Sequence, residues 1–278
     1  MRLVGIAALF AALLMAGTPA GAAEPYHLRI GWVVVPADMI PLMFLKPGLA
    51  PHAGKTYIPE LIHFSGTPTE MTALATGELD LAALAYSTFA FSIENAGIGD
   101  LRVIADTFQD GVPGYHTNEF MVRDDSPIHS VEDLKGKVLA TNETGSAVDI
   151  AMLAMLAKHH LTTRDVTILE VRFPDQKAML QEKKVDLIPA VEPWGYDPQL
   201  RAFARTLFTQ KQAVGRTQMI MQVARAGFLA QHRAVMVDFL EDYLRVLRYL
   251  TDPAHHDEAV RLVTEATKQP ASLYRSWL

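Results

Sequence analysis

Leu74-Ala-Thr-Gly-Glu-Leu-Asp80, followed at once by the apolar run from Leu81 to Ala85, decides the fold, because the same pattern returns later in the chain. The second copy is Leu180-Gln-Glu-Lys-Lys-Val-Asp186, followed by the apolar run from Leu187 to Val191. Leu and Asp are six residues apart in both copies. This spacing predicts a helix end that leads into a buried strand, twice in one chain.

The similarity extends to both sides of each copy. An apolar segment and a helix start precede each copy, and Tyr86 and Glu192 each stand six residues beyond their Asp. Two similar strand-helix-strand lobes, with polar residues at matching strand ends, predict a ligand cleft between the lobes. The preceding segments are 57–64 with Ser65-Gly66-Thr67-Pro68, and 166–173 with Pro174-Asp175.

The N-terminal segment has the features of a cleavable secretory leader. Arg2 provides a positive start, Leu3 to Met15 is an uncharged apolar run, and Ala20-Gly21-Ala22-Ala23 supplies small residues for cleavage. The apolar run is shorter than the ~20 residues that a membrane-spanning helix needs. We therefore expect residues 1–23 to be a signal peptide and the mature protein to be free in the periplasm. The alternative is a membrane anchor.

Composition narrows the class of function. The chain has 278 residues and no cysteine, which excludes thiol catalysis and a thiolate metal site. Its 31 acidic residues outnumber its 25 basic residues, and this balance argues against nucleic acid as a partner. A net charge of −6 does not exclude an anionic ligand, because local dipoles govern a small cleft.

Strands and helices alternate from Leu28 onward, which predicts α/β lobes with mainly parallel sheets. The segment 37–55 contains Pro41, Pro47 and Pro51, so any helix there must be short or broken. The expected strands are 28–35, 57–64, 81–85, 101–108, 119–123, 138–142, 166–173, 187–191 and 218–225, and the expected C-terminal helices are 231–250 and 254–267.

Two segments mark where the chain passes between lobes. The turn Asp110-Gly-Val-Pro-Gly114 is the expected exit from the first lobe, and the chain is expected to return after Glu192-Pro-Trp-Gly-Tyr196. The lobes are then discontinuous in sequence. We expect residues 24–114 and 198–278 to form the first lobe and residues 115–197 to form the second.

Several of these segments resemble the periplasmic solute-binding proteins of the nitrate, taurine and alkanesulfonate type, which serve ATP-driven importers. The resemblance implies the type II periplasmic binding-protein fold, with two hinged lobes that close around one small ligand. The segments that carry it are Leu28-Arg-Ile-Gly31, Ala73 to Asp80, Asp125-Ser-Pro-Ile-His-Ser-Val-Glu-Asp-Leu-Lys-Gly-Lys137, Gly145-Ser146, Val185-Asp186 and Glu192-Pro193.

The chain also departs from that family. Members commonly have Gly where this chain has Lys183, and a plain helix where it has the proline-rich segment 36–51. The second departure weakens any transfer of ligand identity. The sequence ends at Ser276-Trp277-Leu278, within an expected helix, so we expect a C-terminal portion to be missing.

Candidate ligand-binding residues cluster at helix starts that follow strands. A helix start presents unpaired backbone N–H groups and the positive end of a dipole, which suits an anion, and Gly66 and Gly145 would let a ligand approach the backbone. Each cap by itself is better explained as an ordinary helix cap, and it is the shared position of the caps at strand ends in both lobes that favours a site. The candidates are Ser65, Gly66, Thr67, Tyr86, Ser87, Thr88, Asn142, Thr144, Gly145, Ser146, Glu192 and Trp194.

Three of these candidates have open alternatives. Tyr86 and Trp194 suit stacking on an apolar ligand body, or packing at the joint between lobes. Glu192 would repel an anion and suits a ligand amine or hydroxyl, or else it is a solvated or paired residue in the hinge. His159-His160 and His255-His256 lie at helix ends and indicate no metal site.

These observations favour a receptor over an enzyme. We expect a monomeric periplasmic protein that captures a small organic anion and delivers it to an ABC permease, with no cofactor and no metal. One alternative is an enzyme on the same scaffold, similar to the thiamine-pyrimidine synthases, although their cysteine-rich segment is absent here. Another is a periplasmic sensing domain that binds a ligand and acts on a membrane partner.

Overall fold

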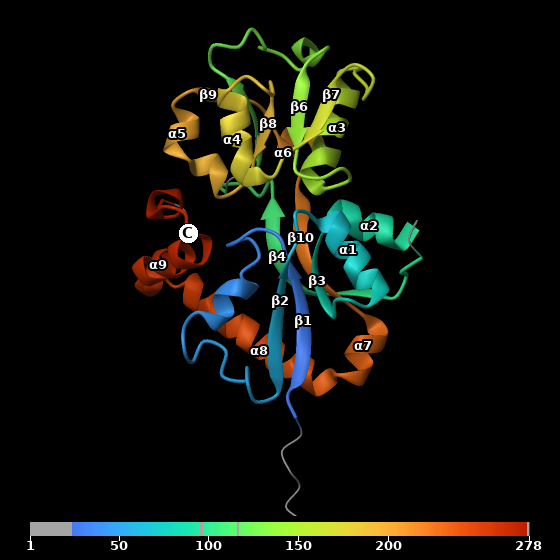
Figure 1. Ribbon diagram of the computed structural model, residues 1–278, viewed down its shortest axis with the longest axis vertical. Coiled ribbons are helices and arrows are strands. Elements are labelled where there is room, and N and C mark those ends of the chain that lie inside the picture. Colours follow the sequence, from blue (N-terminus) through green and yellow to red (C-terminus); the bar gives the residue numbers. More distant parts are fainter. Residues whose placement is uncertain (1–23, 95–96, 116, 277) are drawn as a thin grey trace, which may run out of the picture.

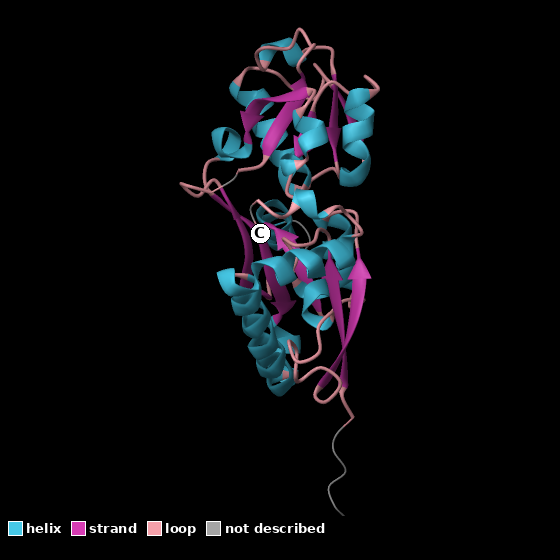
Figure 2. Cartoon of the chain, turned by 90° about the vertical axis from the view of Figure 1, so that its left-hand side faces the viewer, coloured by secondary structure: helices cyan, strands magenta, loops and turns pink. Residues whose placement is uncertain are grey.

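The computed structural model describes residues 24–94, 97–115, 117–276 and 278. The expected leader 1–23, and Trp277 of the expected C-terminal helix, lie outside the described residues. The chain forms two α/β lobes stacked along the long axis of the molecule (Figure 1). Figure 2, turned by a quarter, shows the same two lobes meeting at a narrow waist.

The first lobe contains a sheet with the strand order β2-β1-β3-β10-β4. β3 is buried on both faces, which explains why its sequence is a continuous apolar run. The strands are β1 (Tyr26–Trp32), β2 (Tyr57–His63), β3 (Leu81–Ala85), β4 (Leu101–Asp110) and β10 (Thr217–Arg225).

The second lobe repeats this order. β8-β5-β9 and β6-β7 are joined through a bridge between Leu139 and Leu187, which gives the order β7-β6-β8-β5-β9. In each lobe one strand, β10 or β5, runs antiparallel to its neighbours, and the other pairings are parallel. The strands are β5 (Glu119–Arg123), β6 (Val138–Thr141), β7 (Thr167–Glu170), β8 (Ile188–Ala190) and β9 (Ala204–Thr209).

Helices cover both faces of the first sheet. Phe239 of α8 packs with Tyr57 and Leu28 on one face, while Leu74 of α1 packs with Leu84 on the other. The helices are α1 (Thr67–Thr76), α2 (Tyr86–Glu94), α3 (Ala147–Lys158), α4 (Phe173–Gln181), α5 (Pro198–Arg201), α6 (Gln210–Val214), α7 (Ala226–Gln231), α8 (Arg233–Leu250) and α9 (His256–Thr267).

The repeated Asp has the same role in both lobes. The Asp80 carboxylate accepts the backbone N–H of Arg29 at 2.9 Å, and its own N–H donates to the Arg29 carbonyl. Asp186 makes the same pair of bonds with Val138, at 3.0 and 2.7 Å. Asp80 therefore ties the start of β3 to β1, and Asp186 ties the start of β8 to β6. The predicted repeat is a structural repeat.

One predicted boundary is wrong. The chain was expected to return to the first lobe at residue 198, but β9 pairs antiparallel with β5, so 204–209 belongs to the second sheet. α6 also packs against α3 of the second lobe. The return therefore follows Val214. Little in the sequence indicated that β9 belongs to the second sheet, because the strand is only partly buried.

The segment after β1 contains only a short helix, as its prolines predicted. A single 3₁₀ turn, Ile40–Phe44, interrupts the loop. β1 ends at Trp32, three residues before the predicted end, because the Asp38 carboxylate accepts the N–H groups of Val33 and Val34 at 2.8 and 3.0 Å. Among the described residues, no helix has the length and apolar character to cross a membrane.

The departure at Lys183 yields a prediction about stability. Lys183 has φ of 62° and the equivalent Gly77 has φ of 81°, a left-handed conformation that costs a residue with a side chain about 1–2 kcal/mol. After the entropy cost of glycine, Lys183→Gly should raise the free energy of unfolding by about 0.5–1 kcal/mol in urea denaturation. Gly77→Ala is the matched control and should lower it by about 1 kcal/mol. A destabilised Lys183→Gly variant would contradict this account.

Candidate ligand-binding site

A cavity of ≈ 60 Å³ lies between the lobes, at the carboxyl ends of the parallel strands of both sheets. This is the position at which α/β sheets bind ligands. Both lobes contribute to its wall. The lining residues are Val33, Val34, Ala37, Asp38, Thr67, Ala85, Phe108, Asn118, Asn142, Ser146, Ala147, Val148, Phe173, Val191, Glu192, Met219 and Ile220.

The lining follows the internal repeat. Thr67 and Phe173 begin the equivalent helices α1 and α4, and both line the cavity. Ala85 and Val191 stand at the ends of the equivalent strands β3 and β8, and both line the cavity too. The two lobes therefore present matching positions to one shared hollow. The common hollow that the repeat predicted is present.

Direct hydrogen bonds join the lobes beside the cavity. The Glu143 carboxylate accepts the N–H of Thr69 at 3.1 Å, and the Ser87 hydroxyl donates to the Gly145 carbonyl at 3.1 Å. Two further bonds join the lobes, from the Asn142 amide to the Ser65 carbonyl at 3.1 Å and from the Tyr86 hydroxyl to the Ala147 carbonyl at 3.0 Å.

Gly66 is required by this contact between the lobes. A Cβ there would lie 2.3 Å from Oε2 of Glu143 and 2.8 Å from Nδ2 of Asn142. The other lobe, not a ligand, therefore approaches the Gly66 backbone closely. Gly145 has φ of 82° and lies beside Pro68, so it serves the turn before α3.

The cavity is acidic. Burial raises the pKa of Asp38 to about 6, although the N–H groups of Val33 and Val34 oppose this shift. Burial and the nearby charge of Asp110 raise the pKa of Glu192 to about 7. Among the described residues that line the cavity, none is Lys, Arg or His. The side chains of the wall therefore bring only negative charge.

Three buried polar atoms of the lining have no hydrogen-bond partner among the described residues: Oδ1 of Asp38, Oγ1 of Thr67 and Oδ1 of Asn118. These side chains are 3, 4 and 0 % exposed. Unpartnered buried polar atoms are costly, and they occur in folded proteins mainly where a ligand or water binds. The lining thus offers acceptor atoms to a bound molecule.

Protein carboxylates already occupy the N-terminal turns of the helices that start at the cavity. Glu143 binds the N–H of Thr69 at the start of α1, and Asp149, in the first turn of α3, binds the N–H of Gly145 at 2.9 Å. Asp175 lies in the first turn of α4. Because a helix end carries roughly half a charge, one carboxylate offsets it. The starts of α1 and α3 therefore leave little positive potential for an anion, whereas the first turn of α2 contains no carboxylate.

The structure places the predicted site residues in three environments. Thr67, Asn142, Ser146 and Glu192 line the cavity, whereas Ser65, Gly66, Tyr86, Ser87 and Gly145 form the contact between the lobes. The others lie elsewhere: Thr88 bonds to the Ala85 carbonyl within its own helix turn, Thr144 bonds to Glu170, and Trp194 stacks on Phe173 with ring centres 5.5 Å apart.

Sequence reasoning missed Asp38 and Asn118. Asp38 follows the carboxyl end of β1, the strand end equivalent to the one that precedes Asn142, so the repeat itself contained a signal for it. Asn118 precedes β5, which runs antiparallel, and no strand-end rule points to it. Its burial comes from the crossing of the chain between the lobes, where the Asp110 carboxylate accepts its N–H at 2.7 Å.

A second hollow of ≈ 200 Å³ adjoins the cavity and shares Val33 and Val34 with it. Trp32, His63 and Trp194 give it an aromatic wall. Trp194 therefore faces this outer hollow, beside the smaller acidic cavity.

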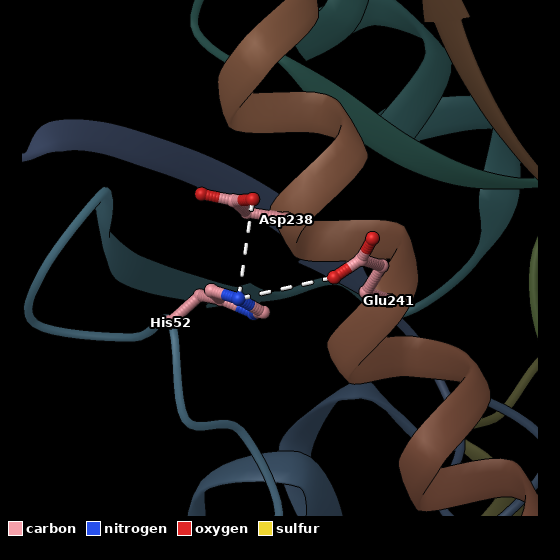
Figure 3. A group of neighbouring side chains, drawn as sticks. All are labelled: His52, Asp238 and Glu241. Atoms are coloured by element: carbon pink, nitrogen blue, oxygen red, sulfur yellow. Dashed lines mark ion pairs between the residues drawn. The ribbon is translucent and has the colours of Figure 1, made fainter.

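His52, Asp238 and Glu241 form a cluster of ionisable residues between the proline-rich loop and α8 (Figure 3). Nε2 of His52 lies 4.0 Å from Asp238 and 3.8 Å from Glu241, which are one turn apart on α8. Nδ1 of His52 bonds to the fully buried Asp242 at 2.8 Å, and the Tyr57 hydroxyl donates to Asp242 at 2.7 Å. These contacts fasten the proline-rich loop to α8, at the amino end of β2 and away from the cavity.

Two lobes of this strand order, enclosing a cavity at the carboxyl ends of both sheets, define the type II periplasmic binding-protein fold. The chain belongs to the NMT1-like family, whose model matches residues 21–264.

Solved structures share the fold. The alkanesulfonate-binding protein SsuA from Xanthomonas axonopodis pv. citri, bound to MOPS, is 21% identical with a TM-score of 0.71, over 91% of this chain and 83% of that one. The periplasmic nitrate-binding protein NrtA from Synechocystis PCC 6803 is 14% identical with a TM-score of 0.69, over 90% and 69%. The desulfurization enzyme DSZB is 18% identical with a TM-score of 0.58, over 90% and 82%.

The raised pKa of Glu192 predicts a pH-dependent stability. Because its pKa is about 7 in the folded protein and 4.5 in the reference state, its stabilising contribution is present below pH 4.5 and is lost as pH rises through 7. Glu192→Gln removes this loss. The free energy of unfolding of the variant, minus that of the natural protein, should be about 2–3 kcal/mol higher at pH 8 than at pH 5 in urea denaturation.

The exposed Glu182→Gln is the control, and its difference from the natural protein should not change with pH. Equal differences for Glu192→Gln at the two pH values would show that the Glu192 carboxyl is not desolvated.

Proposed function

We propose that this protein is an extracytoplasmic solute-binding receptor, which encloses a small organic solute between its lobes and delivers it to an ABC-type permease. The observation that carries the proposal is one cavity lined by equivalent positions of two similar lobes. Membership of the NMT1-like family and the shared fold of the sulfonate- and nitrate-binding proteins support it. A periplasmic location and a cleavable leader belong to the same proposal.

The mechanism follows from the connections between the lobes. The chain crosses once between β4 and β5 and once between β9 and β10, so two short segments can act as a hinge. At the crossings, Asp110 accepts the Thr117 hydroxyl at 2.7 Å, and the Asn118 amide donates to Gln210 at 3.3 Å. A solute that touches both walls stabilises the closed arrangement, because only that arrangement offers every contact at once.

The charge of the solute needs revision relative to the sequence prediction. An organic anion was expected from the helix starts, but Glu143 and Asp149 already offset the starts of α1 and α3, and of the starts at the cavity only that of α2 has no carboxylate. Asp38 and Glu192 then add negative charge to the wall. The proposed solute is therefore small and organic, and the cavity disfavours an anion.

An enzyme remains the second candidate, since DSZB has the same fold. The two functions differ in the fate of the bound molecule. A receptor returns its solute unchanged, whereas an enzyme returns a product.

A disulfide across the lobes tests the proposal, since the chain has no cysteine. A Cβ at Gly66 would lie 3.0 Å from Cβ of Glu143, slightly closer than the ~3.5–4.5 Å of disulfides, so a small opening permits the bond. The variant Gly66→Cys/Glu143→Cys, oxidised in a mixture of small metabolites, should retain one compound through desalting, seen by native mass spectrometry. Reduction should release it chemically unchanged.

The single variant Glu143→Cys is the control and should retain nothing after desalting. Release of an altered compound would favour the enzyme. An oxidised double variant that retains no compound would contradict the receptor.

A further inference from the structure

The hydrogen-bonding groups of the cavity are unequally used. The donors are engaged within the protein: the Ser146 hydroxyl donates to Oδ1 of Asn142 at 2.8 Å, and the Asn142 amide donates to the Ser65 carbonyl at 3.1 Å. The Asn118 amide likewise donates to Gln210 at 3.3 Å. Each of these three side chains therefore has one donor bound within the protein, and each amide keeps one further N–H.

The acceptors, by contrast, remain available. Oδ1 of Asp38 and Oδ1 of Asn118 are buried and have no hydrogen-bond partner among the described residues, and neither oxygen can donate when Asp38 is ionised. Oγ1 of Thr67 is buried and unpartnered as well. The two Oδ1 atoms can be satisfied only by a ligand that brings N–H or O–H donors, whereas the Thr67 hydroxyl can either accept or donate. A sulfonate, nitrate or carboxylate brings only acceptors.

The charge of the wall points the same way. With pKa values of about 6 and 7, both Asp38 and Glu192 bring negative charge to the wall near pH 7. The lining brings no cationic side chain to oppose them within the described residues. An anion would face both carboxyl groups without a counterion, whereas a cation would neutralise them.

The size of the cavity limits the head group. A volume of ≈ 60 Å³ holds roughly four to six groups the size of water, at ~10–15 Å³ each. The rest of the wall is apolar, with Val33, Val148 and Ile220 among its side chains. A planar head of about four heavy atoms, with donors on one side and an apolar group on the other, matches this space.

We propose that the solute carries a small cationic nitrogen head group of the amidine class, whose N–H groups bind the carboxyl groups of Asp38 and Glu192 and the side-chain oxygen of Asn118. This inference rests on the proposed receptor function and names its ligand class. Asp38 and Asn118 come from different lobes, so a head group bound to both also holds the lobes together. The outer hollow beside Trp194 then receives whatever the head group is attached to.

Proton release is the measurement that separates a cation from an anion. A bound cation favours the ionised carboxyls and releases protons at pH 7, whereas a bound anion favours the protonated carboxyls and takes protons up. Other groups face these carboxyls and are present in every variant: Glu70 and Tyr243 near Asp38, and Asp110 and Tyr196 near Glu192. The difference between the natural protein and its variants isolates Asp38 and Glu192.

Three planar probes of equal size differ in charge and in the number of N–H donors: acetamidine, acetamide and acetate. Titration calorimetry at pH 7 and constant ionic strength, in buffers of different ionisation enthalpy, should show that acetamidine binds most tightly and releases protons. Acetate should bind most weakly. Glu192→Gln and Asp38→Asn should each weaken acetamidine about 10- to 100-fold, the value of one charge-assisted hydrogen bond.

Asp38→Asn keeps an oxygen for the N–H groups of Val33 and Val34, so the turn after β1 should survive. The control is Asp197→Asn, which changes an equally buried carboxyl outside the cavity and should leave acetamidine binding unchanged. Methanesulfonate is added as a second anionic probe.

Tighter binding of acetate or methanesulfonate than of acetamidine, or proton uptake on binding, would overturn the amidine class while leaving the receptor intact. No binding of acetamidine would overturn it as well. The receptor itself fails separately, if the disulfide-linked variant retains no compound.

Discussion

The hydrogen bonds that join Asp80 to β1 and Asp186 to β6 are the constraint on which the rest of the structure depends. Asp80 and Asp186 accept and donate backbone hydrogen bonds at the starts of β3 and β8, which sets the register of these strands against β1 and β6. β3 and β8 then end five and four residues after their Asp, at Ala85 and at Ala190. Because both lobes use the same device, their strand ends meet in one cavity.

The cavity concentrates groups that weaken the fold. Asp38 and Glu192 are held where water solvates them poorly, and their ionised forms are disfavoured by burial. A chain selected only for stability would place apolar or paired groups at these positions. Unfavourable groups gathered at one site, facing unpartnered oxygens, are typical of a binding site, where a ligand supplies the missing partners.

The sequence predicted the elements well and the charge of the site poorly. The repeat located the strands, the shared cleft and Glu192, because register along a strand is a local property. The charge of the site depends on residues outside the repeated strands and helix starts. Glu143 reaches α1 from the other lobe, a contact that no local pattern indicates, and Asp38 lies in a loop without regular pattern, where only its place after β1 in the repeat pointed to it. The return of the chain to the first lobe after α6 was not predicted, because β9 shows little alternation of buried and exposed residues.

The bonds between the lobes have a kinetic consequence. Five hydrogen bonds beside the cavity must break before a molecule passes in or out, among them two of Glu143 to the N–H and the hydroxyl of Thr69. At about 0.5–1.5 kcal/mol each, together they hold the lobes shut by roughly 2.5–7.5 kcal/mol. In the proposed receptor, separation of the lobes then governs the dwell time of the bound solute as well as the solute's own contacts do. A permease that binds both lobes and moves them apart would accordingly speed release.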